Sequence, residues 1–278
     1  ALPSRASRRL ARDNPASALA SSAVPSAMVP LGSRHSGVNG RRRREVGSDG
    51  ETRARDEAPE EMISPRVAKY WRQRYSLFSR YDEGIAMDEE GWYSVTPEEV
   101  AARHAELCGR VGGGAAVVVD GFSGVGGNAI QFAKRGCHVV AVEIDPQKVE
   151  FARHNADVYG VEGNIDFVIG DFLRLAPSLK GDVVFLSPPW GGPAYRTIGN
   201  FTLDFLKPED GYSIFQLAQR ITPNIIMFLP RNVDLNQVEE LSWLSSPPLD
   251  LEIEENYIEG NLKGITVCFG NLASASST

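Results

Sequence analysis

The stretch that decides the fold runs from Val117 to Asn128 and reads VVVDGFSGVGGN. A short β-branched run, Ala116–Asp120, ends in a carboxylate and passes into a glycine-rich loop, after which a helix is predicted over Asn128–Arg135. Glycines at a strand-to-helix turn let the backbone approach a ligand closely, and the first turn of the helix offers free N–H groups. This segment therefore predicts a ligand site at the carboxyl end of a parallel strand.

Short apolar runs alternate with amphipathic segments after this loop. The pattern predicts strands and helices in alternation at His138–Glu143, Pro146–Tyr159, Ile165–Ile169, Asp182–Leu186, Ile214–Ile221, Asn224–Leu229 and Leu235–Leu244. Nearly continuous apolar strands separated by helices are typical of a parallel sheet covered on both faces. No helix separates the final strands, Leu251–Tyr257 and Gly264–Phe269, so these two are expected to pair antiparallel at an edge. The predicted fold class is α/β, a Rossmann-like doubly wound sheet.

The chain before this sheet is predicted to have two parts. Residues 1–60 are rich in Ala, Ser, Arg and Pro without apolar periodicity, which predicts a disordered tail. Residues 61–112 are expected to form a small helical lobe, and residues 113–278 the sheet domain. Within the lobe we expect a helix opened by Ser64-Pro65 and an aromatic, loop-like stretch over residues 74–95. A second helix is expected to be capped by Thr96 and to run to Cys108.

Composition and charge exclude several classes of protein. The 278 residues are 42% hydrophobic and 23% charged, and no apolar run is long enough to span a membrane. Three scattered Cys and four His without ligand spacing predict neither a metal site nor a disulfide framework, and favour a reducing environment. Residues 1–60 hold eleven Arg against seven Asp and Glu, which leaves −11 on the rest of a chain whose net charge is −7. Such an acidic body suits end-on recognition of a nucleic acid better than binding along its length.

Carboxylates end the first three predicted strands. Glu143 can accept hydrogen bonds from ribose hydroxyls, and Asp171 with Phe172 suits an adenine amine and ring face. Asp120 would repel a pyrophosphate but would pair with a methionine ammonium group, and the loop departs from the G-x-G-x-x-G spacing of dinucleotide sites. The pattern therefore favours S-adenosylmethionine over a nicotinamide cofactor. Further cofactor contacts are expected from the loop residues Phe122, Gly124, Gly126 and Asn128.

The segment Ser187-Pro188-Pro189-Trp190 follows the fourth strand, at the expected crevice. Methyl transfer to an exocyclic amine needs the base held flat and its N–H groups held in place. Consecutive prolines give a rigid backbone, Trp190 can stack on the base, and Ser187 can bond the amine without acting as a general base. We therefore predict Ser187, Pro188 and Trp190 to form an amine methyltransferase site. An adenine-N6 or cytosine-N4 methyltransferase is the alternative, although its usual first residue is Asp or Asn.

Several collinear segments resemble trimethylguanosine synthases, which transfer two methyl groups to N2 of the 7-methylguanosine cap of small nuclear and nucleolar RNAs. The resemblance runs from about residue 64 to residue 270 and is carried by the glycine loop and by residues 69–71, 77–84, 91–98, 187–193 and 228–232. It implies a class I S-adenosylmethionine-dependent methyltransferase fold with a small helical N-terminal lobe.

The resemblance also implies roles for single residues. Trp190 would stack on the methylated guanine, which is cationic and therefore also attracted to an electron-rich indole. Residues implied near the guanine edge are Ser187 and Asn155, and those implied at the cap triphosphate are Lys69, Tyr195 and Arg231. Phe78 and Thr96 would close over the cofactor. A further basic residue of the family's phosphate region is not placed, because Asn236 and Gln237 stand at the nearby helix start.

The expected partners are a 7-methylguanosine-capped small RNA, bound by its cap end, and snRNP or snoRNP adaptor proteins, with no membrane and no metal. Arg41–Arg44 and the resemblance favour the nucleus, including the nucleolus or Cajal body, with the cytoplasm as a second location. The Arg- and Ser-rich start also fits an organelle transit peptide. A nicotinamide-dependent oxidoreductase and a catalytically silent cap-binding protein are the alternatives from other classes.

Overall fold

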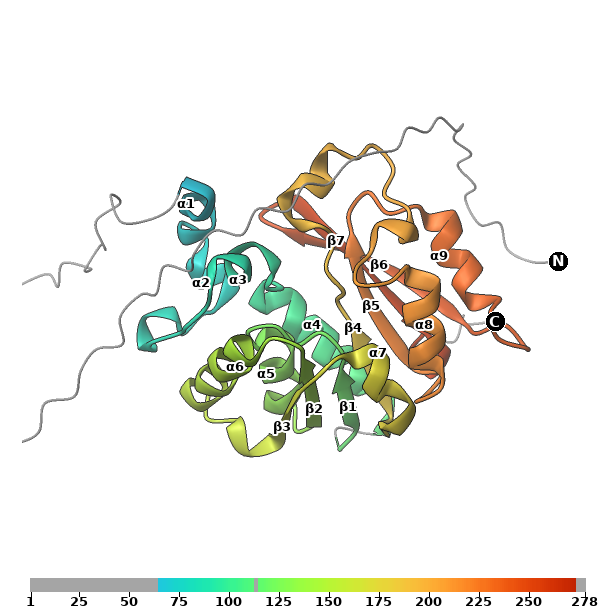
Figure 1. The fold of residues 1–278 in the computed structure, drawn as a ribbon, viewed down its shortest axis with the longest axis horizontal. Helices are drawn as coiled ribbons and strands as arrows, with labels where there is room; N and C mark the ends of the chain where they lie inside the picture. The colour runs from blue at the N-terminus through green and yellow to red at the C-terminus, as the bar shows by residue number, and fades with distance from the viewer. Residues whose placement is uncertain (1–64, 113–114, 274–278) are drawn as a thin grey trace, which may run out of the picture. The chain divides into compact units, whose positions relative to one another are not determined.

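One mixed sheet of seven strands organises the described part of the chain, which comprises residues 65–112 and 115–273 of a computed structural model (Figure 1). The predicted tail over residues 1–60 lies outside the described residues. The sheet order is β3-β2-β1-β4-β5-β7-β6, with strands β1 (Val117–Asp120), β2 (His138–Glu143), β3 (Ile165–Ile169), β4 (Val183–Leu186), β5 (Ile225–Pro230), β6 (Leu251–Ile258) and β7 (Asn261–Phe269).

Strands β1 to β5 run parallel, and the predicted antiparallel pair at the end of the chain is confirmed. β7 lies between β5 and β6 and is antiparallel to both. From β1 the chain fills one half of the sheet with β2 and β3, and it then returns to build the other half from β4. Ligands of such sheets bind at this switch point, outside the carboxyl ends of the strands, which here are the ends of β1 and β4.

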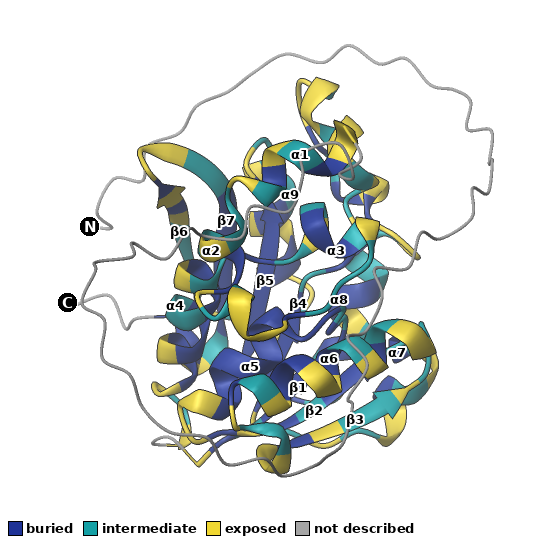
Figure 2. Ribbon diagram, turned by 90° about the vertical axis from the view of Figure 1, so that its left-hand side faces the viewer, coloured by how far each residue is buried: buried dark blue, intermediate teal, exposed yellow. Residues whose placement is uncertain are grey.

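Helices cover both faces of the sheet. One face carries α4 (Glu98–Cys108), α5 (Gly127–Lys134) and α6 (Pro146–Val158), and the other carries α7 (Phe172–Leu175), α8 (Gly211–Gln219) and α9 (Leu235–Ser242). Alternate strand residues serve the two cores: Phe185 packs with the first group of helices, and its neighbours Val184 and Leu186 pack with the second. Burial on both faces explains the continuous apolar strands β1, β4 and β5 in the middle of the sheet, which are coloured mostly as buried in Figure 2.

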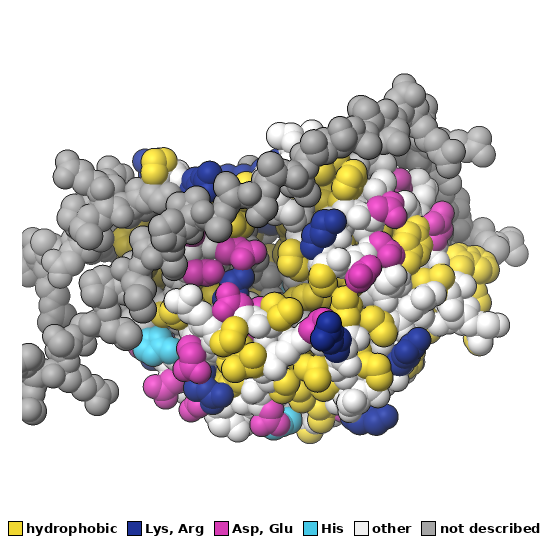
Figure 3. All heavy atoms as spheres, viewed as in Figure 1, with side chains coloured by type: hydrophobic (Ala, Val, Ile, Leu, Met, Phe, Trp, Pro, Cys, Tyr) yellow, Lys and Arg dark blue, Asp and Glu magenta, His cyan; other side chains and the backbone are white. Residues whose placement is uncertain are grey.

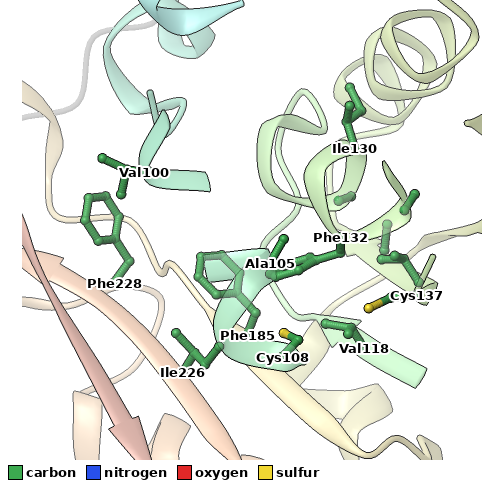
Figure 4. Packing of buried hydrophobic residues seen from close by; sticks show 14 of the residues in the cluster. Val100, Ala105, Cys108, Val118, Ile130, Phe132, Cys137, Phe185, Ile226 and Phe228 are labelled. Atoms are coloured by element: carbon green, nitrogen blue, oxygen red, sulfur yellow. The ribbon is translucent and has the colours of Figure 1, made fainter. Parts of the chain in front are cut away.

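The three cysteines of the chain are all buried and unpaired. Cys108 of α4 packs in the same core as Phe185 and Ile226 of the sheet (Figure 4). Burial raises the pKa of the thiols of Cys108, Cys137 and Cys268. They are structural side chains of the core.

The segment before β1 is more helical than predicted. Residues 74–95, expected to be loop-like, contain α2 (Arg74–Leu77), a 3₁₀ turn (Tyr81–Glu83) and α3 (Glu89–Ser94), and α1 spans Pro65–Trp71 as the Ser-Pro signal predicts. The Asp88 side chain caps α3 by accepting a hydrogen bond from Gly91 N at 2.8 Å. This cap and the acidic first turn after it were a helix signal that the aromatic content of the stretch obscured.

The predicted cap of α4 is wrong. The helix begins at Glu98 with Pro97 at the N-cap position and without a side-chain capping bond from Thr96. The Glu98 carboxylate is engaged over long range instead, because it accepts hydrogen bonds from Ser79 N at 2.5 Å and from Tyr159 Oη at 2.7 Å. It therefore joins three segments of the chain rather than closing a local capping box.

No helix among the residues that the structure describes is long and apolar enough to cross a membrane.

Candidate active site

A cavity of about 460 Å³ opens at the carboxyl ends of the strands. The ends of β1, β2 and β4 with the loops that follow them line one side, and residues of α1, α3 and the segment before α4 line the other. Most of the residues predicted for the site lie in its wall: Lys69, Thr96, Asp120, Phe122, Gly124, Asn128, Glu143, Asp171, Phe172, Ser187, Pro188, Trp190 and Tyr195.

Asp120 ends β1 as a fully buried carboxylate. Its Oδ1 accepts a hydrogen bond from Phe122 N at 3.3 Å, and its Oδ2 has no partner among the described residues. Burial, with a smaller contribution from Glu143, raises the pKa of Asp120 to about 7. Burying a carboxylate oxygen without a partner is costly, so this atom is a ready acceptor for the ammonium group of a ligand.

Glu143 ends the neighbouring strand β2 and is fixed by the backbone. Its Oε2 accepts a hydrogen bond from Gly124 N at 2.9 Å, and its Oε1 accepts one from Asp145 N at 3.0 Å. These bonds hold the carboxylate at the cavity, while each oxygen keeps a further lone pair for a ligand hydroxyl. The geometry fits the ribose contact that the sequence predicts.

Asp171 and Phe172 follow the next strand, β3. Asp171 Oδ1 caps α7 by accepting a hydrogen bond from Leu173 N at 2.9 Å. Phe172 packs against Phe122 with ring centroids 5.6 Å apart, and a Cβ at Gly121 would lie 3.0 Å from the Phe172 ring. The end of β3 therefore adds a third carboxylate and an aromatic wall to the row that begins at β1.

Two glycines of the loop have different tasks. Gly124 lies in the cavity wall with φ +52°, and a Cβ there would meet nothing within 4 Å, so its backbone is open to a ligand. Gly126 has φ +90°, and its Cβ would lie 3.1 Å from the Cβ of Ala152 in α6. Gly126 is not part of the wall. It allows the loop to pass close to α6, which is a conformational role, and its cofactor contact stays a prediction.

Trp190 lies in the loop after β4, in the same wall as Ser187. Its ring centroid is 5.2 Å from that of Tyr195, nearly perpendicular at 84°, and 5.3 Å from that of Phe228. Two aromatic neighbours thus fix the orientation of the indole, as a stacking platform requires. Pro188 is buried beside it and restricts the backbone.

Four basic residues gather at the opening of the cavity, and we name them the mouth cluster: Lys69 of α1, Arg196 of the 3₁₀ turn Gly192–Thr197, Arg231 after β5, and Lys263 of β7. Burial lowers the pKa of Lys69, and the positive charges of Arg196, Lys263 and Arg231 lower it further. Lys69, Arg196 and Lys263 line the cavity, and Arg231 lies beside them outside its wall. The arrangement attracts a polyanion to the entrance.

Phe78 does not reach the cavity. It is 1% exposed and packs against Tyr159, with ring centroids 6.3 Å apart. A Cβ at Gly127 would lie 4.0 Å from Phe78 Cζ, which places the ring behind the glycine loop. In this structure Phe78 supports the loop from the core, and the predicted direct cofactor contact is not found.

Asn155 is also placed away from the cavity, because it is fully buried in α6. Its Oδ1 accepts a hydrogen bond from Ala86 N at 2.8 Å, and its Nδ2 donates to Ala86 O at 2.9 Å and to Val125 O at 3.0 Å. The amide therefore joins the N-terminal helices to the glycine loop. Both N–H groups of the amide and one lone pair of its oxygen are used by these bonds, so the structure supports a positioning role for Asn155, and the guanine-edge role stays a prediction.

Replacing Asn155 by alanine should lower the free energy of unfolding by about 2–4 kcal/mol, because Ala86 N–H and two carbonyls lose their buried partner. The folded protein should keep its KM for its substrate. Urea denaturation and an activity assay well below the midpoint of unfolding would measure both quantities. Asn236→Ala, which removes an exposed local bond to Asp234, is the matched control. A raised KM without a loss of stability would support the guanine-edge role.

Several wall residues were missed from the sequence. Lys148 forms an ion pair with Glu90 of α3 at 2.5 Å, and Arg196 donates a hydrogen bond from Nη2 to Tyr70 Oη at 3.3 Å. Lys207 and Lys263 also line the cavity. The positions of these lysines depend on tertiary contacts that the sequence does not reveal. Arg196 is the exception, because it stands five residues after Gly191, in the loop that the sequence already assigned to the site. Within residues 65–112 and 115–273 no group of three or more His, Cys, Asp or Glu side chains could hold a metal ion.

The sheet order, the row of carboxylates on β1 to β3 and the unpartnered Asp120 oxygen define a class I methyltransferase that uses S-adenosylmethionine. Asp120 would hold the ammonium group of this cofactor, Glu143 the ribose and Asp171 the adenine end. Comparison with known families then identifies the chain as a member of the RNA cap guanine-N2 methyltransferase family, whose model matches residues 115–272.

Curated relatives and solved structures agree with this assignment. The chain is 41% identical over 219 residues to trimethylguanosine synthase of Schizosaccharomyces pombe, covering 77% of this chain and 89% of that protein. It is 35% identical over 236 residues to trimethylguanosine synthase of Saccharomyces cerevisiae, covering 80% and 74%. A solved S-adenosylmethionine-dependent methyltransferase from Agrobacterium tumefaciens shares the fold with a TM-score of 0.50 at 14% identity, over 64% of this chain and 63% of that one. A structure from Porphyromonas gingivalis W83 has a TM-score of 0.53 at 16% identity, over 78% and 52%.

Proposed function

We propose that the protein methylates the N2 amine of 7-methylguanosine at the cap end of RNA, giving 2,7-dimethyl- and then 2,2,7-trimethylguanosine. The observation that carries the proposal is the position of Trp190, an oriented indole between the carboxylate row and the mouth cluster. A flat base stacked there would have its amine near Ser187 and its phosphates toward Lys69 and Arg231. The names of the two yeast relatives support the second methylation.

S-Adenosylmethionine supplies an activated methyl group, so the chain's own residues contribute alignment. Trp190 holds the cationic base by stacking and by cation–π attraction. Ser187 Oγ would accept a hydrogen bond from an N–H group of the N2 amine. This bond would orient the amine so that the lone pair of its nitrogen points at the methyl donor. Pro188 keeps this hydroxyl and the indole at a fixed separation. The cofactor would supply the methyl group to N2 with cleavage of its own sulfur–methyl bond, and N2 would lose one proton to solvent, so the Ser187 hydroxyl need not act as a base.

The test is methyl transfer from labelled S-adenosylmethionine to two dinucleotides, one with a 7-methylguanosine cap and one with an unmethylated cap, followed by mass spectrometry. We expect N2 methylation of the first with kcat/KM at least about tenfold higher, because the unmethylated base loses the charge that the indole attracts. Transfer to an adenine or cytosine oligonucleotide instead would support the alternative amine methyltransferase. Cap binding without transfer would support a silent cap-binding protein.

We also propose small nuclear and nucleolar RNAs as the cellular substrates, delivered by snRNP or snoRNP adaptor proteins, and the nucleus as the main location. The acidic body and the compact mouth cluster support recognition of an RNA end, and Figure 3 shows basic and acidic side chains interspersed over the face that it displays. Arg41–Arg44 supports nuclear entry. Immunoprecipitation with an antibody against the trimethylated cap, from cells with and without the protein, tests the substrates. A tagged full chain tests the location.

A further inference from the structure

The mouth cluster differs from the other basic residues of the fold in its electrostatic surroundings. Arginines and lysines elsewhere are commonly matched by acids: Arg103 with Glu254 at 2.7 Å, and Lys134 with Glu98 at 3.4 Å. Within the part of the chain that the structure describes, none of the four cluster residues has an acidic side chain within ion-pair distance. Their charges are therefore available to an external anion.

Arg196 is held in place at this opening. Its Nη2 donates to Tyr70 Oη at 3.3 Å, and its Cζ lies 5.8 Å from the centroid of the Tyr195 ring. Lys69 Nζ lies 5.6 Å from the centroid of the Tyr70 ring. Two tyrosines thus position Arg196 beside Lys69, and Tyr195 in turn contacts the indole of Trp190. Arg196 is part of the surface that continues outward from the stacking platform.

Lys263 and Arg231 form the other half of the cluster. Pro230 of β5 pairs with Gly264 of β7 in antiparallel register, so the residue after one and the residue before the other lie side by side. These two cations come from the sheet, whereas Lys69 and Arg196 come from the segments that cover it. The cluster therefore combines cations from the sheet end with cations from the segments that cover the sheet.

The number of charges exceeds what the cap alone needs. The bridge between the cap and the first transcribed nucleotide contains three phosphates, each with one negative charge, and the cluster offers four cations. Lys69 and Arg231, which the resemblance assigns to this bridge, and Lys263 beside Arg231 match the three phosphates. Arg196 is the fourth cation and is not needed for these three phosphates. It lies in the 3₁₀ turn Gly192–Thr197, and its ordered guanidinium suits a phosphate oxygen.

We propose that Arg196 binds the phosphate that joins the first two transcribed nucleotides, so that the enzyme recognises the start of the RNA body as well as its cap. The inference rests on the proposed function and names a further part of its substrate. It accounts for the surplus cation without requiring an extended basic surface, because one phosphodiester is the only additional contact. A capped trinucleotide is then a better substrate than a cap dinucleotide.

The experiment compares the 7-methylguanosine-capped dinucleotide, which lacks that phosphate, with the capped trinucleotide, which contains it. Wild-type kcat/KM is expected to be about fivefold higher for the trinucleotide, the gain of one well-placed ion pair. Arg196→Gln should lower the trinucleotide value about fivefold more than the dinucleotide value. Arg220→Gln, which removes an exposed arginine at the end of α8, is the matched control and should leave both unchanged.

Salt dependence gives an independent readout. Binding of the trinucleotide should have a log–log slope against salt steeper by about 0.7 than binding of the dinucleotide, and Arg196→Gln should remove that difference. Equal use of both substrates by the wild type would overturn the inference, as would an equal loss on both in Arg196→Gln, which would assign Arg196 to the triphosphate. Failure of the wild type to methylate either substrate would instead overturn the proposed function.

Discussion

Replacing Trp190 by alanine is expected to abolish methylation of a 7-methylguanosine cap while leaving binding of S-adenosylmethionine nearly intact. Stacking of a base on an aromatic ring contributes about 1–3 kcal/mol, and a desolvated cation–π contact adds about 2 kcal/mol. Loss of both corresponds to a decrease in kcat/KM of a hundredfold or more. The carboxylates proposed to hold the cofactor follow β1 to β3, whereas Trp190 belongs to the loop after β4, so its side chain is not one of the proposed cofactor contacts.

The control variant is Trp190→Phe, which keeps a stacking face but weakens the attraction for a cation. It should retain intermediate activity and discriminate less between methylated and unmethylated caps. Calorimetric titration of cofactor measures the binding that should survive, and it also reports folding, because Trp190 contacts Tyr195 and Phe228. Equal losses of cofactor binding and methyl transfer in Trp190→Ala would contradict the stacking role.

Replacing Asp120 by asparagine should weaken cofactor binding by about a hundredfold, because a charged hydrogen-bond acceptor for the ammonium group is replaced by a neutral amide. The same change should stabilise the free protein at pH 8, since the burial that raises the pKa of Asp120 to about 7 penalises its ionised form. The gain is on the order of 2–4 kcal/mol. Titration calorimetry and thermal unfolding without ligand measure the two effects, and an unchanged cofactor affinity would rule out the contact.

The pH dependence follows from the same raised pKa. In the unfolded chain Asp120 ionises near pH 4, so its contribution to stability is complete below that pH and is lost as pH rises through about 7. The stability of wild type should therefore fall relative to Asp120→Asn between pH 4 and 8. Cofactor affinity should change in the opposite direction, falling about tenfold per pH unit below 7, because binding must then displace a proton. A flat affinity profile between pH 5 and 8 would contradict this account.

Local patterning predicted the sheet because each strand lies between two covered faces. Val183 to Leu186 are buried on both sides, so the run is continuously apolar and unmistakable in the sequence. The N-terminal segment was harder to predict, since α2 and α3 are short and are held by distant segments, α2 by α4 and α3 by α6 through the pair of Lys148 and Glu90. Helices stabilised by distant partners leave only weak periodicity in their own residues.

The residues of the candidate site also fall into two groups, those whose positions local sequence predicts and those whose positions depend on tertiary packing. Asp120, Glu143 and Ser187 follow strands directly, so predicting the strand ends also predicted their places. The positions of Lys263 and Asn155 required knowledge of which strands and helices pack together. Lys263 reaches the mouth cluster only because β7 lies between β5 and β6. Asn155 matches the family pattern, yet tertiary structure directs its amide into the protein interior.

The burial of all three cysteines gives the protein a practical property. A thiol that is shielded from solvent and has a raised pKa reacts slowly with maleimides and iodoacetamides. A single cysteine introduced at an exposed position of the turn after Trp190, such as Ala194 or Thr197, would therefore carry a fluorescent dye without background labelling. Emission from that dye would follow the arrival and departure of an RNA end in real time.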